Sequence, residues 1–178
     1  MTVKSLKDKQ LNKNRKPEWV IKKEKEAERK VPSRVWLYGI HAVRDAIKNQ
    51  NRVKHKLMLT QNAYKKIKDC LTTSSLFAEV LHPRKFLPPL ERNAVHQGIA
   101  LEVNPLNWGS LSEVCAPNNN NKLVLLLDRV TDPQNVGAII RSAEVFGVTA
   151  VATAARYSTP ETGALAKAAS GSLERQPY

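Results

Sequence analysis

Apolar and polar residues alternate in short blocks from residue 35 onward, and these blocks predict strands and helices in turn. Short apolar runs favour strands, whereas an apolar residue at every third or fourth position favours a helix. The elements predicted before residue 104 are strands at 35–37, 56–60, 77–81 and 99–103, helices at 41–49 and 62–71, and a short segment at 83–90. Residues of the last strand should point inward and outward alternately. This order predicts a small α/β sandwich at residues 35–104.

A strand–helix–strand unit is predicted within residues 122–178. The unbroken apolar run at 123–127 predicts a strand buried on both faces of a parallel sheet. Asp132 is placed to cap a helix, Pro133 suits its first turn, and Gly147 marks its end. The elements predicted after that helix are a buried strand at 148–152, a polar loop at 156–162, and a small-residue helix at 164–170 that stops at Gly171.

Residues 105–121 have the composition of a linker between these two parts. Ser110 and Glu113 form a capping-box pattern that supports a single helical turn. Pro117 and the run 118–121, which is four consecutive asparagines, have little to bury, and they predict a mobile loop.

The helix that begins near Pro133 has two distinct faces. Its apolar residues at helical spacing are Val136, Ile139, Ile140, Ala143 and Phe146. Arg141 lies roughly opposite that face, where an arginine is ordinarily just solvated. Ala138 and Val145 flank it, however, and an apolar surround suits a partner subunit or a substrate phosphate. Asn135 stands in the first turn, where backbone N–H groups can receive an anion or where its role can be local capping.

The run from Leu127 to Gly147, LDRVTDPQNVGAIIRSAEVFG, closely resembles the first signature motif of the SpoU (TrmH-type) RNA ribose 2′-O-methyltransferases, of the knotted SPOUT class. The segments 38–43 and 94–99 resemble the two ends of the substrate domain in members that modify large-subunit ribosomal RNA. The similarity suggests the 23S guanosine 2′-O-methyltransferase branch. It implies a ribosomal-protein-like α/β substrate-binding domain, followed by the N-terminal half of a SPOUT parallel-sheet domain.

The resemblance also implies roles for individual residues. Asn135 and Arg141 take the catalytic positions of the motif, and Glu174 takes a usually acidic position that would support the active site. The residues implied to bind RNA are His41, Arg44, His96, Gln97 and Arg129.

Other interpretations of these residues stay open at this point. Either histidine can instead satisfy a buried backbone group, and Gln97 with Gly98 is more typical of a turn than of a base contact. A candidate phosphate-contacting face, which can also be merely solvated, comprises Arg44, Arg52, Lys54 and Lys56.

In the family, the reaction is an in-line transfer of the methyl group from S-adenosylmethionine to a ribose 2′-hydroxyl, and the sites form across a homodimer. The hydroxyl is a poor nucleophile at neutral pH, so alignment and proton removal carry the catalysis. Because a guanidinium loses protons very reluctantly, positioning of the target phosphate is the safer role to expect for Arg141.

Two further family signatures, a glycine-rich segment with a glutamate and a Ser-Leu-Asn-Val-Ser run, do not occur in the sequence. Those segments bind the cofactor, so no cofactor-binding residue is expected here. The resemblance therefore suggests a truncated enzyme or a fragment. The strand at 123–127 would then keep a bare sheet edge, and such a half-domain is expected to be unstable or dependent on a partner.

The composition indicates a polyanionic partner, because the formal net charge is +13. Residues 1–34 hold 12 Lys and Arg against 5 Asp and Glu, and they predict a disordered tail in which 18–30 can form a charged helix. The tail suits either a phosphate-neutralising arm or a solubilising segment; a mitochondrial transit peptide fits less well because acidic residues are present.

Several classes of function are disfavoured. No Gly-x-Gly-x-x-Gly follows Leu127, which argues against nucleotide-dependent redox chemistry. Cys70 and Cys115 have no metal-binding spacing, and no apolar run is long enough to span a membrane, so cytoplasm is the default location. The main alternative to a methyltransferase acting on ribosomal RNA is a non-enzymatic basic RNA-binding protein without cofactor binding.

Overall fold

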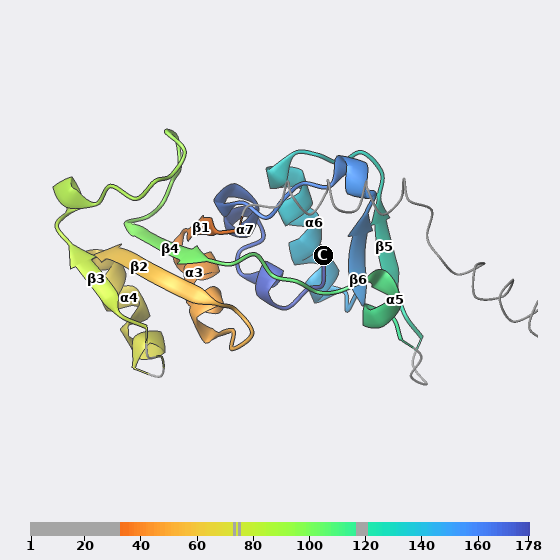
Figure 1. The fold of residues 1–178 in the computed structure, drawn as a ribbon, viewed down its shortest axis with the longest axis horizontal. Helices are drawn as coiled ribbons and strands as arrows, with labels where there is room; N and C mark the ends of the chain where they lie inside the picture. The colour runs from red at the N-terminus through yellow and green to blue at the C-terminus, as the bar shows by residue number, and fades with distance from the viewer. Residues whose placement is uncertain (1–32, 73, 75, 117–120) are drawn as a thin grey trace, which may run out of the picture. The chain divides into compact units, whose positions relative to one another are not determined.

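The computed structural model describes residues 33–178 apart from residues 73, 75 and 117–120 (Figure 1). The predicted basic tail, with its charged helix at 18–30, lies outside the described residues except for its last two positions. The same holds for the predicted mobile loop from Pro117 to Asn120.

The first half of the described chain forms a four-stranded mixed sheet. Its strands are β1 (Val35–Tyr38), β2 (Lys54–Thr60), β3 (Ala78–Leu81) and β4 (Ile99–Val103), in the order β1-β4-β2-β3. β4 runs antiparallel to β1 and to β2, whereas β2 and β3 are parallel. The predicted α/β fold of this part is confirmed, although β2 begins two residues earlier than predicted.

Two helices, α3 (Ile40–Lys48) and α4 (Gln61–Leu71), supply the apolar layer on this sheet. Thr60 caps α4, since its Oγ1 accepts the backbone N–H of Ala63 at 3.4 Å. β4 alternates as predicted: Ile99, Leu101 and Val103 belong to the large core cluster that includes residues of α3 and α4. The opposite face is less exposed than predicted, because Ala100 is buried in a second cluster.

That second cluster is small and contains Met58, Phe86 and Ala100 as its buried members. Phe86 follows the 3₁₀ turn η1 (Pro83–Lys85), in the long segment that joins β3 to β4. The segment therefore covers part of the outer face of the sheet, and this is why β4 is buried at nearly every position.

The second half contains the predicted strand–helix–strand unit. β5 (Val124–Leu127) and β6 (Ala150–Thr153) form a two-stranded parallel sheet, joined by α6 (Pro133–Val145). The predicted capping box at Ser110 begins the short helix α5 (Leu111–Val114). The elements after β6 are the 3₁₀ turn η2 (Ala155–Tyr157), α7 (Gly163–Ala168) and the 3₁₀ turn η3 (Ser172–Glu174).

β5 differs from the prediction, because it is not buried on both faces. Leu127 is 6% exposed, but Leu126 is 72% exposed and its three predecessors are exposed as well. Among the described residues only β6 pairs with β5, so one edge of the strand and much of its surface have no cover. Phe146, which was predicted on the apolar face of the helix, is 78% exposed, since α6 ends at Val145 and Phe146 is its C-cap.

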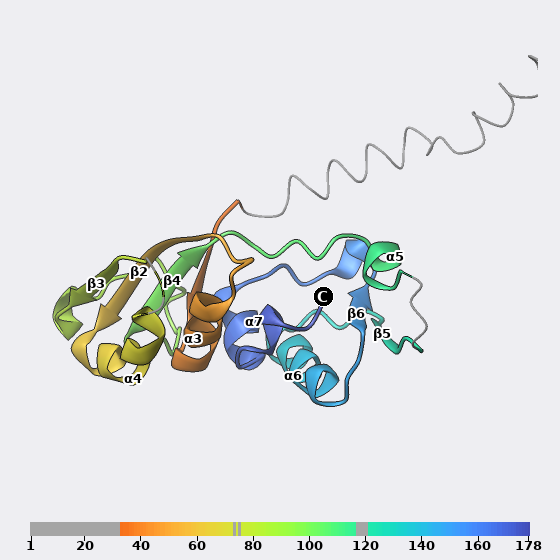
Figure 2. The same cartoon turned by 90° about the horizontal axis from the view of Figure 1, so that it is seen from below.

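The helices α3, α7 and α6 pack in series, with α7 in the middle (Figure 2). α7 also packs on β1, and a single cluster of buried apolar residues includes β1, β4, α6 and α7. Gly137 allows α6 to approach α7 closely, because a Cβ at that position would lie 2.8 Å from the backbone nitrogen of Ala169. The packing thus fixes α6, which carries the family motif, against the rest of the described chain.

Candidate functional site

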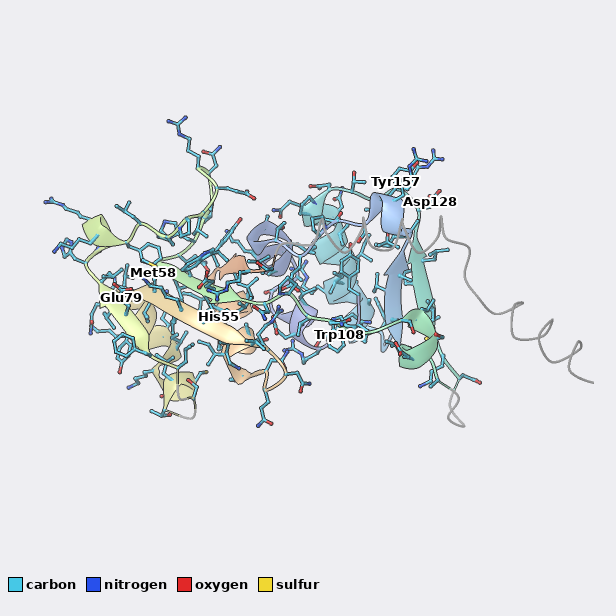
Figure 3. The ribbon with its side chains drawn as sticks, viewed as in Figure 1. His55, Met58, Glu79, Trp108, Asp128 and Tyr157 are labelled. Atoms are coloured by element: carbon cyan, nitrogen blue, oxygen red, sulfur yellow. The ribbon has the colours of Figure 1, made fainter. Side chains whose placement is uncertain are left out.

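The carboxyl ends of β5 and β6 lie at one edge of their sheet and define the candidate site. Asp128 and Arg129 follow β5, and Arg156 and Tyr157 lie in η2 directly after β6. Figure 3 shows Asp128 and Tyr157 next to one another at this edge. In open parallel sheets, ligands bind in the crevice beyond these strand ends, so the position itself favours a functional site.

The first turn of α6 begins at the same edge. The Asp132 carboxylate accepts the backbone N–H groups of Gln134 and Asn135, each at 3.3 Å. The cap is therefore Asp132, as predicted, and the Asn135 amide N–H is already taken by a carboxylate. An anion near this turn would consequently meet the exposed Asn135 side chain rather than that N–H group.

Arg141 is exposed, and within the described part of the chain it makes no hydrogen bond or ion pair. At about 100° and 1.5 Å per residue, Arg141 and Asn135 lie about 120° apart around α6 and about 9 Å apart along it. Ala138, Ser142 and Val145 are exposed on the same side of the helix. The two motif residues therefore border one exposed, largely apolar helix face.

An apolar groove adjoins this helix face and has a volume of about 420 Å³. Its lining residues are Leu125, Ala138, Ile139, Ser142, Ala143, Phe146 and Val148. Ser142 is the one polar side chain among them, and its hydroxyl donates to the Ala138 carbonyl at 3.1 Å. The groove thus offers apolar contact and very little polar recognition.

Four of the predicted RNA-binding residues lie on the four-stranded part. Gln97 adopts φ +57° and Gly98 φ +74°, so these two residues form a turn, as their residue types indicate. The Gln97 Oε1 accepts the Ile40 N–H at 2.9 Å, at the first turn of α3, and His41 is exposed on that turn. His96 Nδ1 accepts the Gly98 N–H at 3.0 Å, as expected for a histidine that satisfies a backbone group.

His96 also packs against Phe86, with 4.8 Å between the ring centroids. Arg44 is partly exposed and its Nε lies 3.3 Å from Asp45 Oδ1. The Gln97 hydrogen bond thus ties its turn to the start of α3, where His41 and Gln97 are exposed and His96 is partly buried.

Arg52 contradicts the predicted phosphate-contacting face, because its side chain is 0% exposed. Its Nε and NH2 donate to Glu174 at 3.1 and 2.5 Å, and its NH1 donates to Glu161 and, at 2.9 Å, to the Asn104 carbonyl. The two carboxylates lie 109 and 122 residues further along the chain. Only the tertiary fold brings them to Arg52, so the sequence spacing gave no sign of them.

The two lysines of the same predicted face are engaged as well. Lys54 Nζ donates to the carbonyls of Ile47 and Asn49 at 3.3 and 2.6 Å, and burial lowers its pKa. Lys56 forms an exposed ion pair with Glu79 at 3.0 Å. These residues mainly hold the fold, and a continuous phosphate-binding face is not formed here.

Glu174 is buried, and its carboxylate serves as a structural anchor. Besides Arg52, it accepts a hydrogen bond from Asn49 Nδ2 at 2.8 Å. Burial raises the pKa of Glu161, the second carboxylate, although Arg52 and the Leu106 N–H both act in the opposite direction. The cluster of Arg52, Glu161 and Glu174, called here the buried charge cluster, joins the four-stranded part to the segments around α7 and η3.

Arg129 lies at the β5 end in the left-handed region, with φ +56°. Its guanidinium carbon is 5.7 Å from the centre of the Tyr157 ring, and that of Arg156 is 5.5 Å from the same ring. Arg156 and Tyr157 were not singled out from the sequence, where they fall in a polar loop. The signal that points to them is their place directly after the second parallel strand.

The described residues contain no group of three or more His, Cys, Asp or Glu side chains that could hold a metal ion. None of the helices in the described part is long and apolar enough to cross a membrane.

Comparison with family models gives two matches. Residues 122–178 match the SpoU rRNA Methylase family, and residues 36–109 match the RNA 2′-O ribose methyltransferase substrate-binding family. The second match covers the four-stranded sheet, and the first covers β5, α6 and everything after them.

Curated relatives include ribosomal RNA methyltransferases. The chain is 34% identical over 151 residues to the 23S rRNA (guanosine-2′-O-)-methyltransferase RlmB of Vibrio vulnificus, covering 82% of this chain and 61% of that protein. It is 39% identical over 99 residues to the human mitochondrial rRNA methyltransferase 1, covering 53% of this chain and 28% of that protein. The chain thus spans less than two thirds of the length of each of these relatives.

Solved structures agree on the fold. The SpoU methyltransferase AviRb from Streptomyces viridochromogenes, crystallised with its cofactor AdoMet, superposes with a TM-score of 0.64 at 21% identity, over 82% of this chain and 54% of that one. An AdoMet-bound rRNA methyltransferase from Sinorhizobium meliloti gives a TM-score of 0.56 at 17% identity, over 82% and 53%. The predicted combination of a small α/β substrate-binding part and half of a SpoU-type sheet is confirmed.

Proposed function

The chain belongs to the SpoU family of RNA methyltransferases, and from that premise we propose that it serves the transfer of a methyl group from S-adenosylmethionine to a ribose 2′-hydroxyl of ribosomal RNA. A guanosine of 23S-type RNA is the proposed target, by analogy with the named Vibrio relative. The observation that carries the proposal is Arg141, which lies in a matching motif on α6, is exposed, and pairs with none of the described residues. The relatives named above are methyltransferases, so the alternative of a non-enzymatic RNA-binding protein has no support from them.

Arg141 would act on the RNA backbone. An arginine N–H fork matches the oxygens of a phosphodiester, so a guanidinium on α6 can hold the phosphate next to the reacting ribose. Holding that phosphate fixes the 2′-hydroxyl in line for attack, and the positive charge favours loss of the hydroxyl proton as the new bond forms. Asn135, on the same helix face, would donate or accept a hydrogen bond that orients the nucleotide.

S-adenosylmethionine supplies an electrophilic methyl carbon when it is bound. It also carries an ammonium, a carboxylate and an adenine, which require several polar partners. The groove beside α6 presents one polar side chain, Ser142, and that hydroxyl already bonds to the helix backbone. The groove therefore does not fit the cofactor, and we assign none of its residues to it.

The remaining assignments follow from the same proposal. Residues 35–104 would bind RNA through the β1–α3 turn around His41, and residues 122–178 would carry the methylase half, with 105–121 as the linker. The exposed face of α6 at Ala138 and Val145 would meet a second copy in a homodimer. The protein would work where ribosomal RNA is made, in the cytoplasm, and its basic tail would add affinity for phosphates.

The test is a methyl-transfer assay with a polypeptide that contains residues 1–178, labelled S-adenosylmethionine and a ribosomal RNA fragment. Arg141→Ala should lower kcat about 100-fold or more, because the lost contact aligns and stabilises the transition state. RNA affinity should fall far less than kcat, by no more than about tenfold, since one of many phosphate contacts is lost. Lys122→Ala, which removes an exposed positive charge before β5, is the matched control. Turnover in Arg141→Ala equal to that of the control would contradict the proposal.

A further inference from the structure

Two arginines from separate loops converge on a single tyrosine beyond the ends of β5 and β6. The guanidinium carbons of Arg129 and Arg156 lie 5.7 and 5.5 Å from the centre of the Tyr157 ring. A ring within about 6 Å attracts a cation through its quadrupole, so Tyr157 holds both side chains at one place. Two positive charges in contact with one ring give this edge a positive potential that attracts an anion.

The backbone of Arg129 gives a second and independent observation. Its φ of +56° lies in the left-handed region, which glycine adopts freely and a long side chain does not. Strain of this kind persists where a side chain is needed for function or where a contact compensates for it. Among the described residues Arg129 forms an ion pair with Asp128 alone, at 3.9 Å with side chains 74% and 85% exposed, and such a pair stabilises very little.

The acidic groups at this edge do not compete strongly for the arginines. The Asp132 carboxylate is engaged by the amides of Gln134 and Asn135 at the start of α6. Asp128 is almost fully open, so an incoming anion can displace it from Arg129. The arginine pair also adjoins the turn that leads into α6, the helix that carries Asn135 and Arg141.

We propose that Arg129 and Arg156, held in place by Tyr157, form a binding site for a backbone phosphate of the RNA strand that enters the proposed active site. The inference rests on the proposed function for the identity of the ligand, since it takes the anion to be RNA. Paired guanidinium forks can contact the free oxygens of one phosphodiester or of two neighbouring ones. The site adds a fixed contact on the methylase part, separate from the RNA contacts around His41.

The test measures binding of the full chain to a fluorescent single-stranded RNA by anisotropy at several salt concentrations, with thermal melting of every variant. Arg129→Gly and Arg156→Ala should each weaken binding about three- to tenfold and reduce the salt slope by roughly 0.7, the value for one phosphate contact on a single strand. Arg129→Gly should melt at the parental temperature or above, because glycine relieves the left-handed strain. A loss of affinity without a loss of stability is the signature expected.

Three further variants sharpen the result. Tyr157→Leu should weaken RNA binding without any change of charge, whereas Tyr157→Phe keeps the ring and should not. Asp128→Asn should strengthen binding, because it removes the competing carboxylate. Lys122→Ala, an exposed charge at the other end of β5, should change the affinity less than twofold.

Unchanged RNA affinity in Arg129→Gly would overturn the proposal, and so would an equal loss in Lys122→Ala, which would show only a general charge effect. The outcome is independent of the methyl-transfer assay. If turnover in Arg141→Ala equalled that of Lys122→Ala while Arg129→Gly still lost RNA affinity, the proposed function would be refuted and this site would stand.

Discussion

Arg52 and Arg141 are both arginines, but they lie in opposite environments. Arg52 is fully buried and donates to Glu161, Glu174 and a backbone carbonyl, whereas Arg141 is exposed and pairs with nothing in the described part of the chain. A buried arginine without partners would be very costly, so the buried charge cluster is explained by the fold alone. Arg141 has no such structural explanation, and this contrast is the reason for assigning it to RNA.

The regions around the two arginines differ in the same way as the side chains: the region around Arg52 is enclosed, and the surface around Arg141 is exposed. The segment around Arg52 is enclosed by chain that is distant in sequence, and β4 beside it is buried at nearly every position. The surface of β5 and α6 is open, with large apolar side chains exposed at Leu126, Val145 and Phe146. Exposed apolar patches of this kind mark surfaces that another polypeptide covers. The first region therefore holds the described chain together, and the second is available for binding.

The largest effect should come from the buried charge cluster. Arg52→Met removes the positive partner of two buried carboxylates, and breaking such a cluster typically costs about 3–5 kcal/mol. Arg44→Met is the control, because Arg44 is partly exposed and pairs only with its neighbour Asp45, so it should cost less than about 1 kcal/mol. Urea unfolding followed by circular dichroism measures both. Equal stability in the two variants would remove the distinction between the regions.

A second comparison lies within β5. Leu127→Ala should destabilise the chain by roughly 2–5 kcal/mol, since its side chain is buried against α6. Leu126→Ala should change the stability by less than about 0.5 kcal/mol, because the side chain is 72% exposed. Urea unfolding followed by circular dichroism measures the stability of both variants. An equally large loss at Leu126 would mean that this face is covered in solution.

The smallest effect is a difference in pH dependence. Burial raises the pKa of Glu161 above its ordinary 4.5, so the stability contributed by its protonated form is present below pH 4.5 and is lost as the pH rises through the folded pKa. The hydrogen bond from Arg175 lowers the pKa of Glu144 below 4.5, so the stability contributed by its ionised form is present above pH 4.5 and is lost as the pH falls through the folded pKa.

Glutamine substitutions should therefore give opposite trends in melting temperature. Relative to the parent, Glu161→Gln should gain as the pH rises from 4.5 to 7, because glutamine resembles the protonated acid. Glu144→Gln should be less stable than the parent at pH 7, and the difference should shrink as the pH falls below 4.5. Scanning calorimetry across this range checks both, and parallel trends for the two variants would contradict the opposite effects assigned to burial at Glu161 and to the Arg175 hydrogen bond at Glu144.

The local elements were readable from the sequence because their causes are local. Asp132 and Pro133 begin α6, Ser110 begins α5, and Gly171 follows α7 in the left-handed conformation, as the residue types require. Gln97 and Gly98 form a turn for the same reason. These features depend on a few neighbouring residues, so no knowledge of the tertiary fold was needed.

The burial of side chains and their hydrogen-bond and ion-pair partners could not be predicted from neighbouring residues in this way. Leu123 to Leu126 were expected to be buried, but cover for a strand comes from its neighbours in space, and the described residues supply one neighbouring strand for β5. Arg52 was expected at the surface because its two carboxylates lie more than 100 residues away. Arg156 and Tyr157 were missed because a polar loop gives no periodic signal. The sequence therefore identified the candidate-site residues that lie in the motif, but not those in the loop after β6.

The close approach of α6 to α7 at Gly137 has a consequence for evolution. The backbone of α6 packs there directly against Ala168 and Ala169, and a methyl group at position 137 would collide with both. Arg141 lies one helical turn further along α6. Its position relative to a phosphate therefore depends on the packing at Gly137, which is buried and contacts no substrate. Gly137→Ala, which replaces a hydrogen by a methyl group, would therefore displace Arg141 from the position in which it can contact the phosphate.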